Sequence, residues 1–334
     1  MDNWVLIIGI YLRFVICNLK HFPLALFAPL RLPFIEKNVT EMEDPRISDL
    51  IKKESGDQEP SFILIGCPVD EGVERNGGRR GAAQAPALVR KYLNKMTPPP
   101  DRVEVFMESL SPGLDLGDVP AGSMEQMQQN LGEQIAPWLK NGIPVIVLGG
   151  GHETTYGHYL GYRNAGLSHE IVNLDAHTDV RELKNGAGHS GSPFRQILED
   201  EETLCRSYKA AGLQPHAVAK SHLEYIEHHG GEWHLYPDTD MSLISRLYSN
   251  SDYPVMTTFD MDGVDQSQAP GVSAPCANGL DKSLWFHAAY LAGRNPKVKS
   301  MDLVEVNPQY DRDDQTARLA ALTVWNFLYG LSLR

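Results

Sequence analysis

The chain has 334 residues, a formal net charge of -13 and a hydrophobic content of 42%. This composition is typical of a soluble globular protein with one large or two small domains. The acidic balance comes without basic runs, which argues against nucleic acid or an anionic membrane surface as the main partner. The four cysteines include no C-x-x-C pair, which fits reduced thiols inside a cell better than a disulfide framework or a zinc knuckle.

The N-terminal segment differs from the rest of the chain. Residues from Trp4 to Cys17 are strongly apolar, but Arg13 interrupts them, and a spanning helix needs about 20 apolar residues. The start "MDN" lacks the basic residues of a secretory signal, and the sequon at Asn38 is a match by pattern only. We expect residues 1–57 to form an extension outside the core and the protein to be cytoplasmic, with membrane association or targeting left open.

Five short runs rich in branched aliphatic residues follow, and each ends in Gly, Asp, His or Glu. Continuous apolar runs of this length are typical of strands buried on both faces. The predicted strands span 61–67, 144–150, 171–177, 255–262 and 298–306.

Amphipathic patterns lie between and after these runs. We predict helices over 84–93, from the N-cap Ser123 to the region of Gly142, and over 313–331. Strands that alternate with helices indicate a three-layer α/β/α fold with a central, mainly parallel sheet. Residues 58–334 read as one catalytic domain. Ligands of such sheets bind outside the carboxyl ends of the strands.

Nitrogen and oxygen ligands gather at these strand ends. Six side chains in "GGGHE", "DAHTD" and "FDMDGVD" follow three of the predicted strands: His152, Asp175, His177, Asp179, Asp260 and Asp262. Because positions i and i+2 of a strand point the same way, we expect both members of each closely spaced pair to face one site. Four carboxylates carry a charge of about -4, which two divalent ions would balance. The motifs together predict a two-metal site.

The ligand types favour manganese. A carboxylate majority with two imidazoles and no thiolate suits Mn²⁺, with Fe²⁺, Co²⁺ or Zn²⁺ as possible substitutes. Two ions about 3.5–4 Å apart lower the pKa of a bound water, so hydrolysis is the expected chemistry. Nucleotide binding is disfavoured, because "LGGGHE" has neither the G-K-[ST] of a P-loop nor a spaced G-x-G-x-x-G.

The ordered motifs, followed by "MDLVEVNP", resemble the metal motifs of the ureohydrolase superfamily, which comprises arginase, agmatinase and formimidoylglutamase. The resemblance covers roughly residues 60–332 and implies an arginase-like fold with two Mn²⁺ per subunit. By this resemblance Asp175 and Asp260 bridge the ions, whereas one histidine and one aspartate complete each: His152 with Asp179, and His177 with Asp262. Glu305 matches the acid that holds the planar cationic group of the substrate, and Asp302 matches a residue that supports the ligands.

Within the superfamily the chain is most similar to the formimidoylglutamases. Guanidino hydrolases usually carry "GGDHS" where this chain has "GGGHE", and residues 70–90 together with "HSGSPFRQIL" resemble formimidoylglutamase loops, including Asn76 and Ser190. The resemblance implies hydrolysis of N-formimidoyl-L-glutamate to L-glutamate and formamide, a step of histidine degradation. Arginases use a proton-shuttle histidine where this chain has Ser190, which leaves Asp179 as the candidate proton relay and His189 as an auxiliary candidate.

The expected substrate is a small amidine that carries two carboxylates. Arg181 lies where the superfamily contacts the substrate tail and would bind a carboxylate bidentately, and Arg75 and Arg79 could reach the second one. Solvation or an ion pair with a neighbouring glutamate is the alternative for both. The cationic tail of agmatine would be repelled by Arg181.

Three other functions stay open. They are another ureohydrolase activity on an arginine, agmatine or guanidino-acid substrate, a two-metal phosphoesterase, and a non-catalytic homologue that acts as a binding protein. A phosphoesterase would have no need of Glu305 facing an anionic substrate, and a non-catalytic homologue usually loses ligands. The superfamily resemblance also implies a homo-oligomer, a trimer or hexamer.

Overall fold

The computed structural model describes residues 44–54, 56 and 58–334, which belong to one compact unit. The apolar N-terminal segment and the sequon at Asn38 lie outside the described residues. Among the described residues, no helix is long and apolar enough to cross a bilayer.

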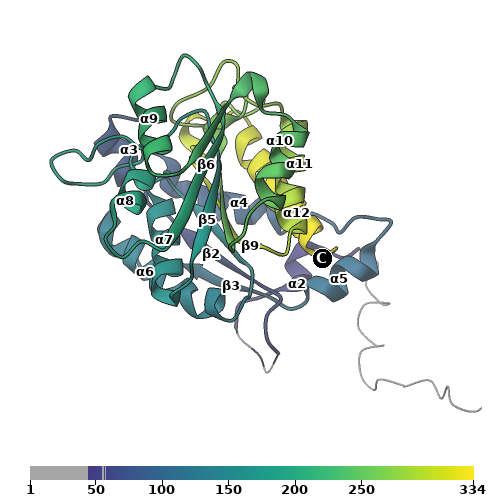
Figure 1. The fold of residues 1–334 in the computed structure, drawn as a ribbon. Coiled ribbons are helices and arrows are strands. Elements are labelled where there is room, and N and C mark those ends of the chain that lie inside the picture. The colour runs from purple at the N-terminus through teal and green to yellow at the C-terminus, as the bar shows by residue number, and fades with distance from the viewer. Residues whose placement is uncertain (1–43, 55, 57) are drawn as a thin grey trace, which may run out of the picture. The chain divides into compact units, whose positions relative to one another are not determined.

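A nine-stranded sheet forms the centre of this unit (Figure 1). Every pairing between neighbouring strands is parallel, and the spatial order is β1-β3-β2-β4-β9-β8-β5-β6-β7. The strands are β1 (Ile51–Lys52), β2 (Phe62–Cys67), β3 (Gly113–Asp118), β4 (Val145–Gly149), β5 (His169–Leu174), β6 (Cys205–Leu213), β7 (Glu232–Leu235), β8 (Val255–Asp260) and β9 (Val298–Val304).

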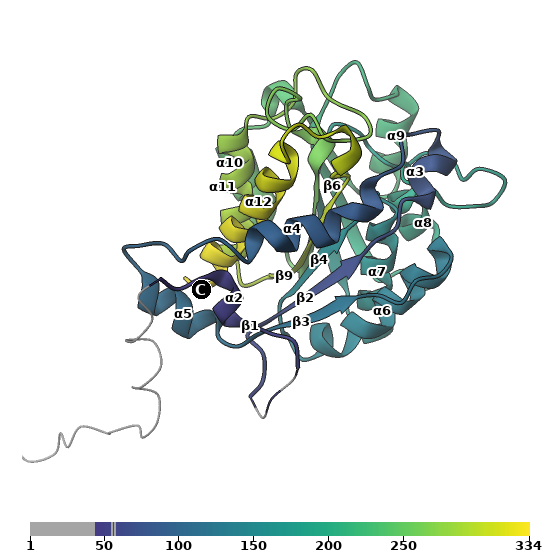
Figure 2. The same ribbon diagram turned by 180° about the vertical axis from the view of Figure 1, so that it is seen from behind.

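Helices cover both faces of the sheet, so the predicted three-layer α/β/α fold is confirmed (Figures 1 and 2). On one face α6 packs against α7, and α7 against α8; on the other, α12 packs against α11, α4 and α5. The helices are α2 (Ile47–Leu50), α3 (Glu71–Asn76), α4 (Ala85–Leu93), α5 (Val103–Leu110), α6 (Met124–Lys140), α7 (Thr154–Ala165), α8 (Pro193–Glu199), α9 (Lys220–His228), α10 (Met241–Ser249), α11 (Lys282–Arg294) and α12 (Gln315–Leu331).

Close helix contacts depend on residues without side chains. A Cβ atom on Gly157 of α7 would lie 2.8 Å from the Gln128 Cα of α6, and one on Gly293 of α11 would lie 2.0 Å from the Phe327 carbonyl oxygen of α12. Both pairs therefore pack backbone against backbone. The Ser123 hydroxyl accepts a hydrogen bond from the Gln126 amide, so the predicted start of α6 is confirmed.

The compact unit begins before residue 58, where the sequence places the start of the catalytic domain. Ile47 and Leu50 of α2 are fully buried, and β1 pairs with β3 at the edge of the sheet. These residues therefore contribute to the core, although a strand of two residues has too short an apolar run to be recognised in the sequence.

Four adjacent strands position the candidate site. The chain passes from β4 to β5 across the sheet, and β9 and β8 fill the two places between them. The carboxyl ends of β4, β9, β8 and β5 therefore lie side by side at the middle of one sheet edge. In parallel α/β sheets this reversal of strand order is the usual place for a ligand.

Candidate metal centre

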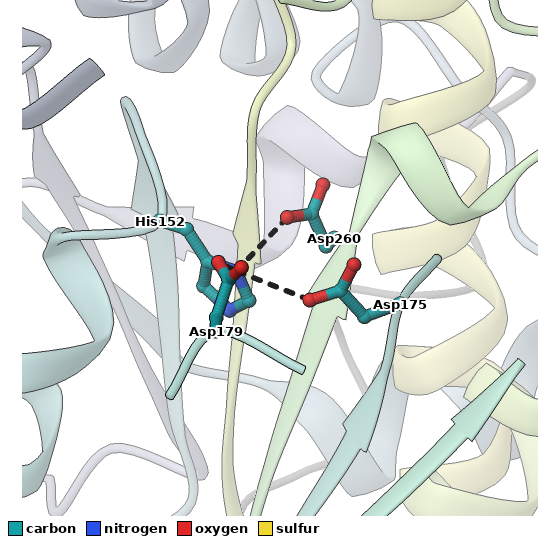
Figure 3. Close-up of side chains that lie close together, drawn as sticks. All are labelled: His152, Asp175, Asp179 and Asp260. Carbon is teal, nitrogen blue, oxygen red and sulfur yellow. Dashed lines mark ion pairs between the residues drawn. The ribbon is translucent and has the colours of Figure 1, made fainter. Parts of the chain in front are cut away.

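The six predicted ligands converge at this edge in two groups that share Asp175. One group contains His152, Asp175, Asp179 and Asp260, and within each group the ligand atoms all lie within 4.8 Å of one another. The other contains Asp175, His177 and Asp262. Figure 3 shows the three carboxylates of the first group around the His152 ring.

The His152 ring faces the carboxylates with one nitrogen. Its Nδ1 atom lies 2.9 Å from oxygens of both Asp179 and Asp260 and 3.5 Å from Asp175 Oδ2. Its Nε2 atom lies 3.1 Å from the Thr258 hydroxyl on β8, which fixes the ring orientation. Such a partner on the far nitrogen is the usual way to orient a ligating histidine.

Turns, rather than the predicted strand alternation, bring the closely spaced ligands together. The backbone N–H of His177 donates to Asp175 Oδ1 at 2.7 Å, and that of Asp262 donates to Asp260 Oδ1 at 2.9 Å. β5 ends at Leu174 and β8 at Asp260, so each aspartate bends the following two residues back toward its own carboxylate. The convergence agrees with the sequence prediction, but its structural cause differs.

Two acidic residues of the site adopt a left-handed backbone conformation that residues other than glycine rarely take. The φ angle is 46° at Asp179 and 64° at Glu305. Such residues cost of the order of 1–3 kcal/mol and cluster at functional sites, where the surrounding structure holds them. The Glu305 Oε1 atom accepts from the His152 N–H at 2.9 Å, whereas its buried Oε2 has no hydrogen-bond partner among the described residues.

The charge of the cluster fits cations. Burial, together with the Asp262 and Asp175 carboxylates, holds the pKa of Asp260 well above its usual range, and burial raises the pKa of Asp262 to about 7. Burial and the Asp260 charge likewise raise the pKa of Glu305. The Asp262 charge raises the pKa of His177. Buried carboxylates in such excess call for protons or metal ions, and the mixed oxygen and nitrogen donors suit divalent manganese.

A cavity of about 290 Å³ opens onto the cluster. Its lining combines four predicted ligands, Glu305 and residues of neighbouring segments. The lining residues are Asn76, Gly77, Gly78, Arg79, His177, Asp179, Arg181, Ser190, Asp260, Asp262, Ser273, Ala274 and Glu305. Ser273 and Ala274 are absent from the residues singled out in the sequence, since "GVSAP" carries no charge or motif that would mark it. A cavity of this size suits a small metabolite.

The structure distinguishes among the three predicted arginines. Arg181 lines the cavity, is exposed, and donates to Asn76 Oδ1 at 3.4 Å. Arg79 also lines it, but its guanidinium donates to the backbone oxygens of Ser273 and Val272. Arg75 pairs with Glu71 and Glu125 and is absent from the cavity lining. Arg75 therefore makes the ion pair that the sequence left as its alternative, and the substrate contact expected of it stays a prediction.

The structure also gives the partners of His189 and Asp302. His189 is buried, its Nδ1 accepts from the Gly191 N–H, and its Nε2 lies 3.0 Å from the Glu182 carbonyl oxygen. Both ring nitrogens therefore have backbone partners, and the auxiliary proton-transfer role of His189 stays a prediction. Asp302 is bonded to Thr155 and His158 rather than to any of the six ligands.

Ser190 and Asn76 do meet at the cavity. The Asn76 amide donates to the Ser190 hydroxyl at 3.2 Å, which joins the end of α3 to a segment 114 residues further along the chain. Support for the ligands also comes from residues that the sequence did not mark. Asn173 donates to Asp175 Oδ2 at 3.1 Å and to the Tyr208 hydroxyl, which in turn donates to the Thr178 carbonyl oxygen.

Comparison with known proteins agrees with this geometry. The family model described as "Arginase family" matches residues 60–330. The chain is 38% identical over 276 residues to a formimidoylglutamase of Geobacillus thermodenitrificans, covering 79% of this chain and 82% of that protein. It is 36% identical over 281 residues to a formimidoylglutamase of Chromobacterium violaceum, covering 80% and 87%. The crystal structure of Trypanosoma cruzi formiminoglutamase with Mn²⁺ superposes with a TM-score of 0.80 at 28% identity, covering 87% of this chain and 100% of that one.

Proposed function

The chain belongs to the arginase family, and we propose that it hydrolyses a linear amidine, N-formimidoyl-L-glutamate, to L-glutamate and formamide. One observation carries the proposal: a single small cavity is lined by predicted metal ligands, by the acid Glu305 and by the exposed cation Arg181. The relatives named formimidoylglutamase support the choice of substrate, because the chain covers more than four fifths of each.

Two Mn²⁺ ions per subunit are part of the proposal. His152 and Asp179 would hold one ion and His177 and Asp262 the other, with Asp175 and Asp260 shared. When bound, the ions would lower the pKa of a water molecule toward neutrality and polarise the amidine.

Glu305 recognises the reacting group in this proposal. Its Oε1 is occupied by the His152 N–H, whereas its Oε2 has no hydrogen-bond partner among the described residues. An amidinium N–H would satisfy this buried oxygen with a charge-assisted hydrogen bond. The carboxylate thereby orients the planar cation for attack at its carbon.

Asp179 is the proposed proton carrier. It lines the cavity and its carboxylate lies beside His152, so it borders both the substrate and the ligand cluster. Attack by water forms the new carbon–oxygen bond, and Asp179 passes a proton from that water to the glutamate nitrogen. The carbon–nitrogen bond then breaks, giving formamide and the free amine of glutamate.

Arg181 selects the tail. Its guanidinium is exposed at the cavity and holds one weak hydrogen bond, to Asn76, so it can bind a substrate carboxylate bidentately. The cationic tail of agmatine would meet the same charge unfavourably. Another ureohydrolase activity, on a guanidino acid, would use the same groups and is the competing candidate.

A parallel substrate assay tests the proposal. The Mn²⁺-loaded protein is incubated separately with N-formimidoyl-L-glutamate, arginine, agmatine and guanidino acids, and glutamate and urea are both quantified. We expect glutamate from the first substrate and no urea from the others. Release of urea without glutamate would mean that the substrate is a guanidino compound, while the proposed metal site would stand. If neither glutamate nor urea forms, the hydrolytic function is contradicted. We also propose that the chain forms a trimer or hexamer, which the family resemblance supports. Light scattering would measure the molar mass of the assembly.

A further inference from the structure

Glu153 is a buried carboxylate beside the candidate site with no part in the proposed chemistry. It follows His152 at the start of α7 and is fully buried. Its Oε1 accepts a hydrogen bond from the Gly72 N–H at 2.8 Å, a residue 81 positions earlier in the chain. Its Oε2 has no hydrogen-bond partner among the described residues. Burying a carboxylate for one hydrogen bond is costly, so a role beyond packing is expected.

Gly72 joins Glu153 to the part of the cavity that carries Arg181. While its N–H binds Glu153, its carbonyl oxygen accepts from the Ser190 N–H at 3.1 Å. Gly72 lies in the first turn of α3, whose last residue, Asn76, binds both the Ser190 hydroxyl and Arg181. A continuous chain of hydrogen bonds therefore runs from Glu153 through Gly72 to the substrate-tail side of the cavity.

The far end of the same loop is fixed in a similar way. The buried Asp70 carboxylate accepts from the Gly81 N–H at 2.8 Å and from the Ala83 N–H at 3.3 Å. The residues between the two anchored ends include Asn76–Arg79, which line the cavity. Two buried carboxylates thus clamp the loop at both ends.

Gly151 makes room for Glu153. A Cβ atom at residue 151 would lie 2.2 Å from Glu153 Oε2 and 2.4 Å from Val73 Cγ2, both far closer than atoms can approach. The φ angle of Gly151 lies outside the left-handed region, so space rather than backbone conformation requires glycine here. A side chain at 151 would have to push the Glu153 carboxylate away from Gly72.

We propose that Glu153 is a positioning residue for the substrate tail: through Gly72 it sets the position of α3, whose last residue Asn76 contacts Arg181, and Gly151 keeps the space for its carboxylate free. This inference rests on the proposed function. It assigns to the pair Gly151 and Glu153 the selection of a substrate with an anionic tail, a role distinct from metal binding.

The test compares E153A and E153Q with the control E74Q, which alters an exposed glutamate of α3 that pairs with Arg80. E153A should raise KM for N-formimidoyl-L-glutamate about tenfold or more, because a charge-assisted hydrogen bond is lost, while kcat and manganese content change little. E153Q keeps an acceptor for Gly72 and should restore KM to within about threefold of wild type, since neutral hydrogen bonds are roughly half as strong. An unchanged KM in E153A, or an E153Q as impaired as E153A, would overturn the inference.

A substrate without carboxylates separates positioning from general damage. For an N-alkylformamidine, E153A and wild type should have kcat/KM values within about threefold of each other, because Arg181 has nothing to bind. Equal losses on both substrates would mean that Glu153 supports the site as a whole and would refute the assignment.

Gly151 offers an independent variant. G151A should raise KM as E153A does, and the double variant G151A/E153A should be no worse than the worse single variant, because both changes break the same contact. If the KM increases of the two single variants multiply in the double variant, the coupling between Gly151 and Glu153 is contradicted. Hydrogen exchange of the peptide containing Gly72 should accelerate in E153A and not in E74Q, which is measurable without turnover. If wild type fails to hydrolyse N-formimidoyl-L-glutamate, the proposed function fails, whereas unchanged exchange in E153A would sink the inference alone.

Discussion

Replacing Arg181 by alanine should impair substrate binding and leave the fold intact. The side chain is exposed, and within the described part of the chain it makes one weak hydrogen bond, to Asn76 at 3.4 Å. Its removal should therefore change the free energy of unfolding by less than about 0.5 kcal/mol. A bound carboxylate would cover the guanidinium and form charge-assisted hydrogen bonds. Losing about 2 kcal/mol of such bonding corresponds to a drop of about 30-fold in kcat/KM.

Steady-state kinetics with N-formimidoyl-L-glutamate measures this change, and most of it should appear in KM. R181K retains the charge without the planar fork and should give an intermediate loss. A charge reversal, R181E, should weaken binding further and reduce the discrimination against agmatine. The assignment of Arg181 to the substrate tail is refuted if R181A has the KM of wild type. It is also refuted if R181A loses as much kcat/KM on a formamidine without carboxylates as on N-formimidoyl-L-glutamate.

Other predictions concern the metal ligands, the histidine and pH. D260N should lose most bound manganese and reduce kcat by at least about 100-fold, since Asp260 is a proposed ligand of both ions. Elemental analysis beside the exposed control D238N measures this, and full metal content would contradict it. H189A should retain kcat within about threefold yet lose about 1–3 kcal/mol of stability, because two backbone hydrogen bonds disappear. A large fall in kcat in folded H189A would restore His189 to the proton path. In the metal-free protein, burial raises the pKa of Asp262 to about 7. A raised carboxyl pKa stabilises the folded state below the unfolded value, and this contribution is lost as pH rises through about 7. The melting temperature of the metal-free protein should therefore fall between pH 5.5 and 8, and both Mn²⁺ and D262N should make the fall smaller. A metal-free melting temperature that rises over this range would contradict the assignment.

The strands that carry the site could be predicted because they are continuous apolar runs with polar ends. The strands β1, β3, β6 and β7 cannot be predicted in this way, because their residues do not form continuous apolar runs. β6 contains Lys209, whose charge is compensated by Glu170 at 2.7 Å, a partner on the neighbouring strand β5. A sequence read segment by segment does not reveal which charges neutralise each other across a sheet.

The same limit applies to side chains at the site, whose partners cannot be predicted from the sequence. Arg75 could be recognised as a cation in a loop, but its partner Glu125 lies 50 residues away on another element. His189 sits beside a motif, yet its ring nitrogens bind backbone groups that depend on the folded loop. The ligand identities required only residue type and order along the chain, whereas their actual convergence comes from turns closed by Asp175 and Asp260.

Crystals grown with Mn²⁺ and measured at the manganese absorption edge test the central claim most directly. The account predicts two anomalous peaks about 3.5–4 Å apart, with Asp175 and Asp260 in contact with both. A single peak at saturating Mn²⁺, or two peaks that Asp175 and Asp260 do not share, would contradict it.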